Sequence, residues 1–190
     1  MKVDSKNVAI KYVKLSKLRI VELLLITTVP SMVVSIYGFP PLELILFTVL
    51  GGTLLAVSAN VLNQIFEIST DSLMERTVNR PLVTGEISKK NAYIYSISLG
   101  LIGYLTLYTQ STILAANIAL SANIFYSFIY TLILKPRTNQ NIVIGGAAGA
   151  APVLIGWSAT GAELEIGSWL LFLLVFLWTP AHFWALSLEN

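Results

Sequence analysis

Long apolar runs, separated by short polar breaks, constrain this chain more than any other feature. A helix needs roughly 20 apolar residues to cross the hydrocarbon core of a bilayer, and about six such runs follow one another along the 190 residues. They lie near residues 18–37, 42–66, 91–108, 112–134, 142–160 and 169–188. The runs lack the dyad alternation of barrel strands, and helices satisfy their own backbone in lipid. The sequence therefore predicts an all-α, polytopic transmembrane helical bundle.

The composition agrees with lipid as the solvent. The chain is 55% hydrophobic and only 12% charged, with a mean hydropathy of +0.75, which excludes an ordinary soluble domain and gives no reason to expect nucleic acid as a partner. It contains no cysteine, so disulfides, thiolate nucleophiles and cysteine metal sites are excluded. No repeat or linker divides it, and residues 1–190 are expected to form one membrane-embedded domain.

The basic residues predict the orientation. Lysine and arginine remain preferentially on the cytoplasmic side of a membrane, and all 12 of them fall within residues 2–19, 76–90 and 135–137, segments that six spans would place on one side. The opposite loops, near 38–41, 109–111 and 161–167, carry none. We therefore expect a multi-pass protein of a prokaryotic cell membrane with a cytoplasmic N-terminus, and residues 1–17 as a basic cytoplasmic segment along the anionic surface.

Polar side chains with helical spacing open the long loop at residues 60–90. Asn63, Glu67 and Asp71 follow one another at intervals of four residues, so on a helix they share a face, with roughly 5–6 Å between neighbours. Asn60 lies one turn earlier on nearly the same face. An amide oxygen and two carboxylates suit Mg²⁺, which uses few protein oxygens and completes its octahedron with water and phosphate. The pattern predicts a magnesium site at the end of the second span.

Basic residues accompany this motif. Arg76 and Arg80 would be one turn apart if the segment stays helical, and Lys135 and Arg137 belong to the next loop on the same side. Guanidinium groups can fork onto phosphate oxygens. Charges in such a loop are most often a solvated surface, but the four-residue spacing of the oxygen ligands favours a site for a prenyl diphosphate, which has an anionic head and an apolar tail.

The same residues carry a family resemblance. The run from Asn63 through Glu67 to Asp71 resembles the first signature of the UbiA superfamily of intramembrane prenyltransferases, with Glu67 where Asp is commoner. The segments DSLMERTVNRPLVTGEIS, YTLILKPRTNQNIVIGGAAGAAPVLIGWSATG and FLWTPAHFWAL resemble its protoheme IX farnesyltransferase branch. That resemblance implies about nine helices and a second acidic motif after the sixth. The chain accordingly looks like an N-terminal fragment of about two thirds of such an enzyme, and we expect it to be inactive alone.

The resemblance also implies a reaction. A farnesyl group would pass from farnesyl diphosphate to a vinyl group of heme B, giving heme O and diphosphate. Mg²⁺ would be held by Asn63, Glu67 and Asp71, and heme A synthase or a terminal oxidase would be possible assembly partners. The residues expected to be catalytic are Asn63, Glu67, Asp71, Arg76 and Arg80. Those expected to bind substrate are Asn60, Lys135, Arg137 and His182, and Arg76, Arg80, Lys135 and Arg137 would all contact the diphosphate.

Two further features allow two interpretations each. His182, the only histidine, follows Trp178 by four residues and could ligate heme iron or serve as a structural or interfacial group. Gly145 and Gly149 form a small-xxx-small pattern, which indicates either close helix packing or room for a flat macrocycle. Trp157 and Trp169 flank the third outer loop and are expected to be interfacial anchors.

Two rival functions remain open at this level. Another enzyme of the superfamily would share the first motif but prenylate a quinone precursor or a glycerol phosphate. A transporter would use acids at a helix end as an ion pathway. The transporter is disfavoured because the ionisable residues are almost confined to one side of the predicted bundle.

Overall fold

The computed structural model describes residues 5–188, and the side chains of residues 8–17 and 26–185. Every element within residues 5–188 is helical, which confirms the all-α prediction. The helices are α1 (Ser5–Ser16), α2 (Leu18–Ser35), α3 (Leu42–Phe66), α4 (Ile68–Asp71), α5 (Lys89–Gln110), α6 (Ile113–Ile124), the π-helix η1 (Phe125–Leu134), α7 (Lys135–Arg137), α8 (Asn141–Ala159) and α9 (Ile166–Leu188).

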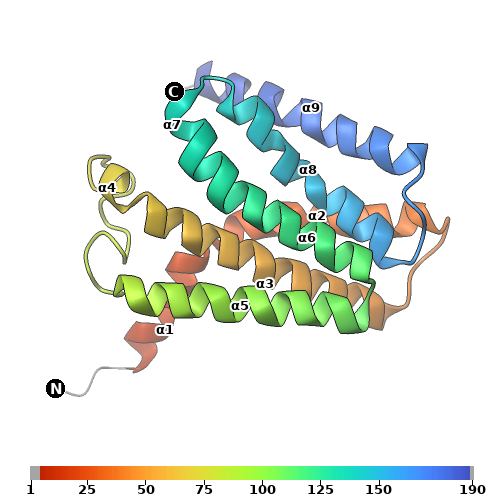
Figure 1. Ribbon diagram of the computed structural model, residues 1–190, viewed down its shortest axis with the longest axis horizontal. Helices are drawn as coiled ribbons and strands as arrows, with labels where there is room; N and C mark the ends of the chain where they lie inside the picture. Colours follow the sequence, from red (N-terminus) through yellow and green to blue (C-terminus); the bar gives the residue numbers. More distant parts are fainter. Residues whose placement is uncertain (1–4, 189–190) are drawn as a thin grey trace.

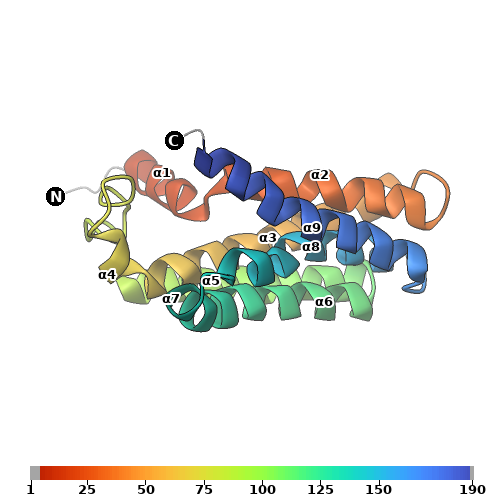
Figure 2. The ribbon, with the colours of Figure 1, turned by 90° about the horizontal axis from the view of Figure 1, so that it is seen from above.

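The long helices pack against one another in one bundle. α3 and α5 make the most extensive pair, and α8 packs against α2, α6 and α9. The short helices α4 and α7 lie at the same end of the bundle as α1 and the last turns of α9 (Figures 1 and 2). The elements that carry the predicted polar motif and the basic loops therefore meet at one end.

Four segments of the described chain are long and apolar enough to span a membrane: Leu42–Phe66, Ile113–Arg137, Asn141–Ala159 and Ile166–Ala185. The described apolar part of α2, Ile26–Ser35, is shorter. α5 has 22 residues, but its serine, threonine and tyrosine side chains make it less apolar. The protein is thus a multi-pass membrane protein, with helices at all six predicted positions.

Local sequence signals explain where two of these helices begin. The Ser88 side chain accepts a hydrogen bond from Asn91 N at the start of α5, and Thr112 does the same for Ala115 N before α6. Such caps satisfy amide groups that have no partner inside the helix. α2 and α8 approach closely at Gly156, where an added Cβ would lie 2.3 Å from the Thr28 carbonyl oxygen. Only glycine permits this contact.

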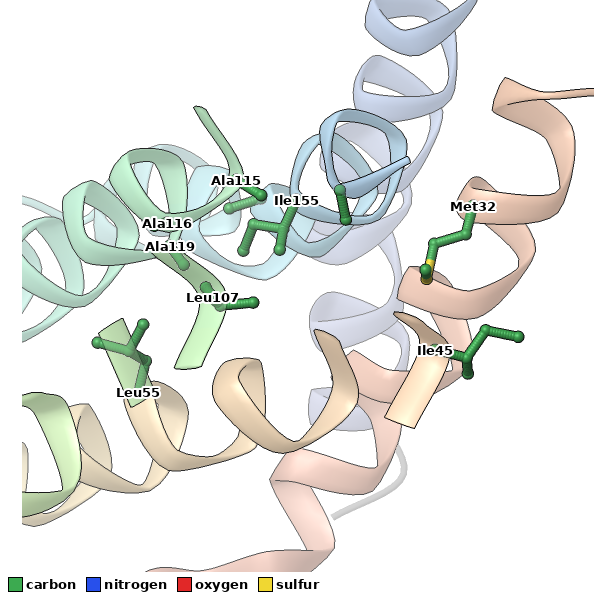
Figure 3. Packing of buried hydrophobic residues seen from close by; sticks show 10 residues of the cluster. Met32, Ile45, Leu55, Leu107, Ala115, Ala116, Ala119 and Ile155 are labelled. Carbon is green, nitrogen blue, oxygen red and sulfur yellow. The ribbon is translucent and has the colours of Figure 1, made fainter. Parts of the chain in front are cut away.

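Two apolar clusters hold the bundle together. The first joins α2, α3, α5, α6 and α8, and Figure 3 shows Met32, Ile45, Leu55, Leu107 and Ile155 among its members. The second lies nearer the polar end of the bundle, where Leu15 of α1 packs with residues of α3, the long loop and α5.

The N-terminal segment is more than a surface anchor. Leu15 is fully buried, and the Gln64 side chain donates a hydrogen bond of 2.6 Å to the Leu15 carbonyl. Tyr12 packs edge-on against Tyr95 of α5. α1 is therefore docked onto α3 and α5, a role that the prediction for residues 1–17 did not include; residues 1–4 lie outside the described range.

Two other expectations need correction. The fourth predicted span is not a uniform α-helix, because residues Phe125–Leu134 adopt a π-helix. Trp157 is only 2% exposed and donates its indole N–H to the Glu163 carbonyl at 2.9 Å. It is a buried residue that fixes the outer loop, so the assignment as an interfacial anchor was wrong.

Candidate functional site at the polar end of α3

Asn63, Glu67 and Asp71 retain the predicted one-face arrangement. α3 ends at Phe66 and α4 starts at Ile68, yet Glu67 N donates to the Asn63 carbonyl at 3.0 Å and Asp71 N donates to the Glu67 carbonyl. These bonds preserve helical spacing across the junction. As whole residues, the three are 3%, 9% and 4% exposed, respectively. The end of α3 thus places an amide and two carboxylates inside the protein.

Each of these side chains contacts a cation from a different part of the chain. Lys17 Nζ donates to Asn63 Oδ1 at 3.3 Å. Lys135 pairs with Glu67, and Arg80 pairs with Asp71. We call Lys17, Arg80 and Lys135 the inner cations. Three fixed cations face two carboxylates, so the cluster carries surplus positive charge and is suited to a polyanion.

Lys17 is the site residue that the sequence did not reveal. It lies between α1 and α2 with φ 48° and ψ 49°, a left-handed conformation that costs a non-glycine residue about 1–3 kcal/mol. Burial, followed by the nearby Arg80, lowers its pKa to about 8. Glu67, Asp71 and Lys135 also act on it electrostatically. The helix junction therefore directs an ammonium group into the cluster.

Arg76 and Arg137 do not join the inner cations. The chain after Asp71 forms turns up to Ser88, so the condition that would place Arg76 and Arg80 one helical turn apart is not met. Arg80 turns back to Asp71, whereas Arg76 is exposed. Arg137 is exposed on α7, two residues beyond Lys135.

An apolar cavity of about 320 Å³ starts beside the cluster. Asn60, one turn before Asn63, lines it, as do Tyr126 and Tyr130 of η1. Farther along, its walls come from α2, α3, α6, α8 and α9 and are mainly alanine, glycine and threonine residues. A volume of this size is within the range of small-molecule pockets. The arrangement places the charged cluster beside an apolar chamber within the bundle.

The two glycines of α8 differ in how closely they are packed. Both Gly145 and Gly149 line the cavity. A Cβ at Gly145 would lie 2.5 Å from Tyr130 Cδ2, so this glycine permits the close fit of the Tyr130 ring, which stacks on Tyr126 with 5.4 Å between centroids. At Gly149 the nearest atom, Thr179 Oγ1, is 3.8 Å from the added Cβ, an ordinary van der Waals contact. Gly145 thus supports the packing interpretation, and room for a flat macrocycle stays a prediction.

His182 lies in the C-terminal half of α9. Its side chain is exposed and stacks on Trp178, with ring centroids 4.6 Å apart and planes inclined by 12°. The next residue, Phe183, lines the cavity.

The donor set fits a hard cation. Asn63, Glu67 and Asp71 offer one neutral and two anionic oxygens, a small set that leaves coordination positions for water and phosphate. Among the described residues, no group of three His, Cys, Asp or Glu side chains could hold a metal by itself. A metal site here would therefore need the Asn63 amide and ligands from outside the protein in addition to the two carboxylates.

Comparison with solved structures supports this architecture. The chain aligns with a UbiA homologue from Archaeoglobus fulgidus, solved with GPP and Mg²⁺, at a TM-score of 0.68 and 26% identity, covering 87% of this chain and 60% of that one. A second structure of a UbiA homologue from that organism, with DMAPP and Mg²⁺, gives the same TM-score at 25% identity and covers 89% of this chain and 60% of that one.

Curated relatives resemble the chain more closely in sequence. Protoheme IX farnesyltransferase 1 of Saccharopolyspora erythraea is 45% identical over 99% of this chain, and the chain spans 60% of its length. The protoheme IX farnesyltransferase of Nostoc is 48% identical over 93% of this chain and 56% of the relative. That of Thermus thermophilus is 44% identical over 93% of this chain, but the match covers 29% of that protein. Residues 24–190 match the UbiA prenyltransferase family, and the chain therefore belongs to that family.

Proposed function

We propose that this chain carries the prenyl-diphosphate site of an enzyme that transfers a farnesyl group to a vinyl group of heme B. The names of its curated relatives support the substrate pair. The observation that carries the proposal is the convergence of Lys17, Arg80 and Lys135 on the Glu67–Asp71 pair beside an apolar cavity. A charged head and an apolar tail would each find a matching environment.

Asn63, Glu67 and Asp71 would hold Mg²⁺ between the protein and the diphosphate. When bound, the ion would supply positive charge to the oxygens on which negative charge grows as the allylic C–O bond breaks. The inner cations contact the same three side chains, so diphosphate oxygens entering the cluster would meet both. Arg80 and Lys135 would then bind the leaving group from two loops, while Arg76 and Arg137 would add positive charge at the rim.

The reaction would form a C–C bond between the vinyl group and the allylic carbon of the farnesyl chain. Diphosphate leaves with the electron pair of the C–O bond. Water then adds to the resulting cation on the former vinyl group and loses a proton, giving a hydroxyethylfarnesyl side chain. An apolar chamber lined by Tyr126 and Tyr130 would keep water from the allylic carbon before the new bond forms.

The second substrate would lie beside the α8–α9 pair. Gly149 of α8 and Phe183 of α9 both line the cavity, and an added Cβ at Gly149 would lie 3.8 Å from its nearest neighbour. His182 is the candidate ligand for heme iron because imidazole is a common axial ligand. Replacement by alanine should change the heme absorption bands of the loaded protein; unchanged bands at equal heme occupancy would exclude ligation.

Product analysis tests the function. Membranes containing the full-length protein should convert farnesyl diphosphate and heme B to a product heavier by one farnesyl group plus one hydroxyl group, and EDTA should stop the conversion. Transfer to an aromatic acid or to a glycerol phosphate instead would assign another reaction of the family. Absence of transfer to any of these acceptors would contradict the enzymatic function.

The membrane, orientation and partners are also proposals. We infer a prokaryotic cell membrane, a cytoplasmic site, and heme A synthase or a terminal oxidase as assembly partners. Because the chain has no cysteine, one introduced cysteine reports on one loop. In intact cells, an impermeant maleimide should label Glu163→Cys but not Asn79→Cys, both of which are exposed positions; the reverse pattern would invert the orientation.

A further inference from the structure

A short hydrogen-bond chain connects the π-helix to the candidate metal ligand Asn63. Thr131, which is 5% exposed, donates its hydroxyl proton to the Tyr126 carbonyl at 2.8 Å. Asn63 Nδ2 lies 3.1 Å from the Thr131 hydroxyl oxygen. A hydroxyl group has one proton and two acceptor sites. Since its proton is used on Tyr126, Thr131 can only accept from Asn63, which requires the NH₂ group of the amide on that side.

The oxygen end of the Asn63 amide also requires this orientation. Lys17 Nζ contacts Asn63 Oδ1 at 3.3 Å, and an ammonium group can donate hydrogen bonds but not accept them. Lys17 and Thr131, at opposite ends of the Asn63 amide, thus require the same orientation of that group. The amide oxygen is directed toward the inner cations, and the nitrogen toward η1.

The π-helix supplies the register for this contact. The Thr131 side chain bonds to the carbonyl of the fifth residue before it, whereas serine and threonine in an α-helix bond back to the third or fourth. π-Helical turns are frequently found at functional sites. Here the wider turn brings Thr131 to Asn63, and Lys135 follows at the end of η1, where it pairs with Glu67.

We infer that Thr131 is a positioning residue that holds the Asn63 oxygen toward the divalent cation bound with the diphosphate. This inference rests on the proposed function, because it requires Asn63 to be a metal ligand. Residues that orient metal ligands typically change metal affinity about 10- to 100-fold when they are removed. Without the Thr131 hydroxyl, the amide could rotate and present NH₂ groups to the cation.

Mn²⁺ binding provides a test that does not depend on turnover. The full-length protein in detergent, with farnesyl diphosphate present, would be titrated with Mn²⁺ and followed by electron paramagnetic resonance. Thr131→Val should raise the Kd for Mn²⁺ by about tenfold or more, and Thr131→Ser should restore it. Ser127→Ala is the matched control, since Ser127 is a fully buried hydroxyl on the same π-helix without a hydrogen-bond partner among the described residues.

A double-mutant cycle distinguishes the role of Thr131 from the existence of the metal site. If Thr131 acts through Asn63, the double variant Asn63→Ala/Thr131→Val should bind Mn²⁺ no more weakly than Asn63→Ala alone. An unchanged Kd in Thr131→Val, with a raised Kd in Asn63→Ala, would overturn the role of Thr131 and leave the metal site intact. An unchanged Kd in Asn63→Ala would refute the metal site itself. If Thr131→Val does not fold, the test uses Thr131→Ser, which keeps the hydroxyl group, and the control Ser127→Ala. A Kd for Mn²⁺ that is raised equally in both variants would overturn the inference.

Discussion

The buried charges at the end of α3 and the exposed charges of the same loops are chemically alike but differently placed. Arg80 and Lys135 pair with the buried carboxylates of Asp71 and Glu67, although Lys135 is itself largely exposed. The charged groups of Glu75, Arg76 and Arg137 are exposed away from that motif. We call these last three the outer charges. An ion pair inside the protein is screened much less than a pair at the surface. The comparison teaches that contact with the α3 motif, and not mere membership of a basic loop, should decide how strongly a charge affects the reaction.

The largest difference in activity is expected between Asp71, a buried acid of this loop region, and Glu75, an exposed one. Asp71→Ala should lower kcat by about a thousandfold, because it removes a metal ligand whose effect is realised as the leaving group becomes charged. Glu75→Ala should stay within about twofold of the parent protein, as expected for an exposed side chain. Activity of each variant would be compared at equal amounts of folded membrane protein. Full activity of Asp71→Ala would remove the basis of the site.

The two arginines should differ next. Arg80→Ala removes a partly buried guanidinium and leaves Asp71 unpaired, so kcat/KM for the prenyl diphosphate should fall about a hundredfold. Arg76→Ala should raise KM only a few-fold at low ionic strength, and that effect should vanish in about 0.5 M salt because exposed charges are screened. Equal, salt-independent losses in both variants would show that the loop closes over the substrate and brings Arg76 inside.

A smaller contrast is expected between Lys135 and Arg137. The Lys135 side chain is 44% exposed although it pairs with Glu67, so solvent already weakens its field. Lys135→Gln should raise KM about tenfold, and Arg137→Gln less than threefold. Steady-state kinetics over a range of prenyl-diphosphate concentrations would distinguish them. A larger effect from Arg137 would place the diphosphate nearer α7 than the ion pairs indicate.

The smallest predicted effect depends on pH and involves Lys17. Its pKa is lowered from 10.5 to about 8, first by burial and then by Arg80. The ammonium group therefore loses its proton as the pH rises above 8, and kcat/KM for the prenyl diphosphate should fall about threefold by pH 9.5. Lys17→Arg should abolish this decline, since arginine stays protonated.

Whereas activity should fall above pH 8, the Lys17 contribution to stability should rise over the same pH range. Between pH 8 and 10.5 the unfolded chain keeps the Lys17 proton while the folded protein has released it, so the Lys17 contribution to the free energy of unfolding rises with pH. Chemical denaturation at several pH values, with Lys17→Met as the control, would measure that contribution. A Lys17 contribution that stays constant up to pH 10.5 and falls above it would show that the Lys17 pKa is raised and not lowered.

The sequence predicted much of the site because its strongest signal is local. Asn63, Glu67 and Asp71 share a face through backbone hydrogen bonds between residues four apart, and no distant contact is needed to anticipate that. The arginines were harder, since helical spacing was assumed beyond Asp71 where the chain forms turns. Lys17 and Thr131 gave no signal: one depends on a left-handed junction and the other on a π-helical turn.

By itself, the amino-acid sequence determined the helical membrane bundle, the positions of its long helices and the row of oxygen ligands at the end of α3. These follow from interactions between near neighbours and from the cost of exposing polar backbone to lipid. The tertiary structure decided which cations reach that row, where the apolar cavity begins and how the Asn63 amide is oriented. Those features arise between segments that are far apart in the sequence. Lys135 and Glu67, for example, are 68 residues apart, and packing of the whole bundle brings them together.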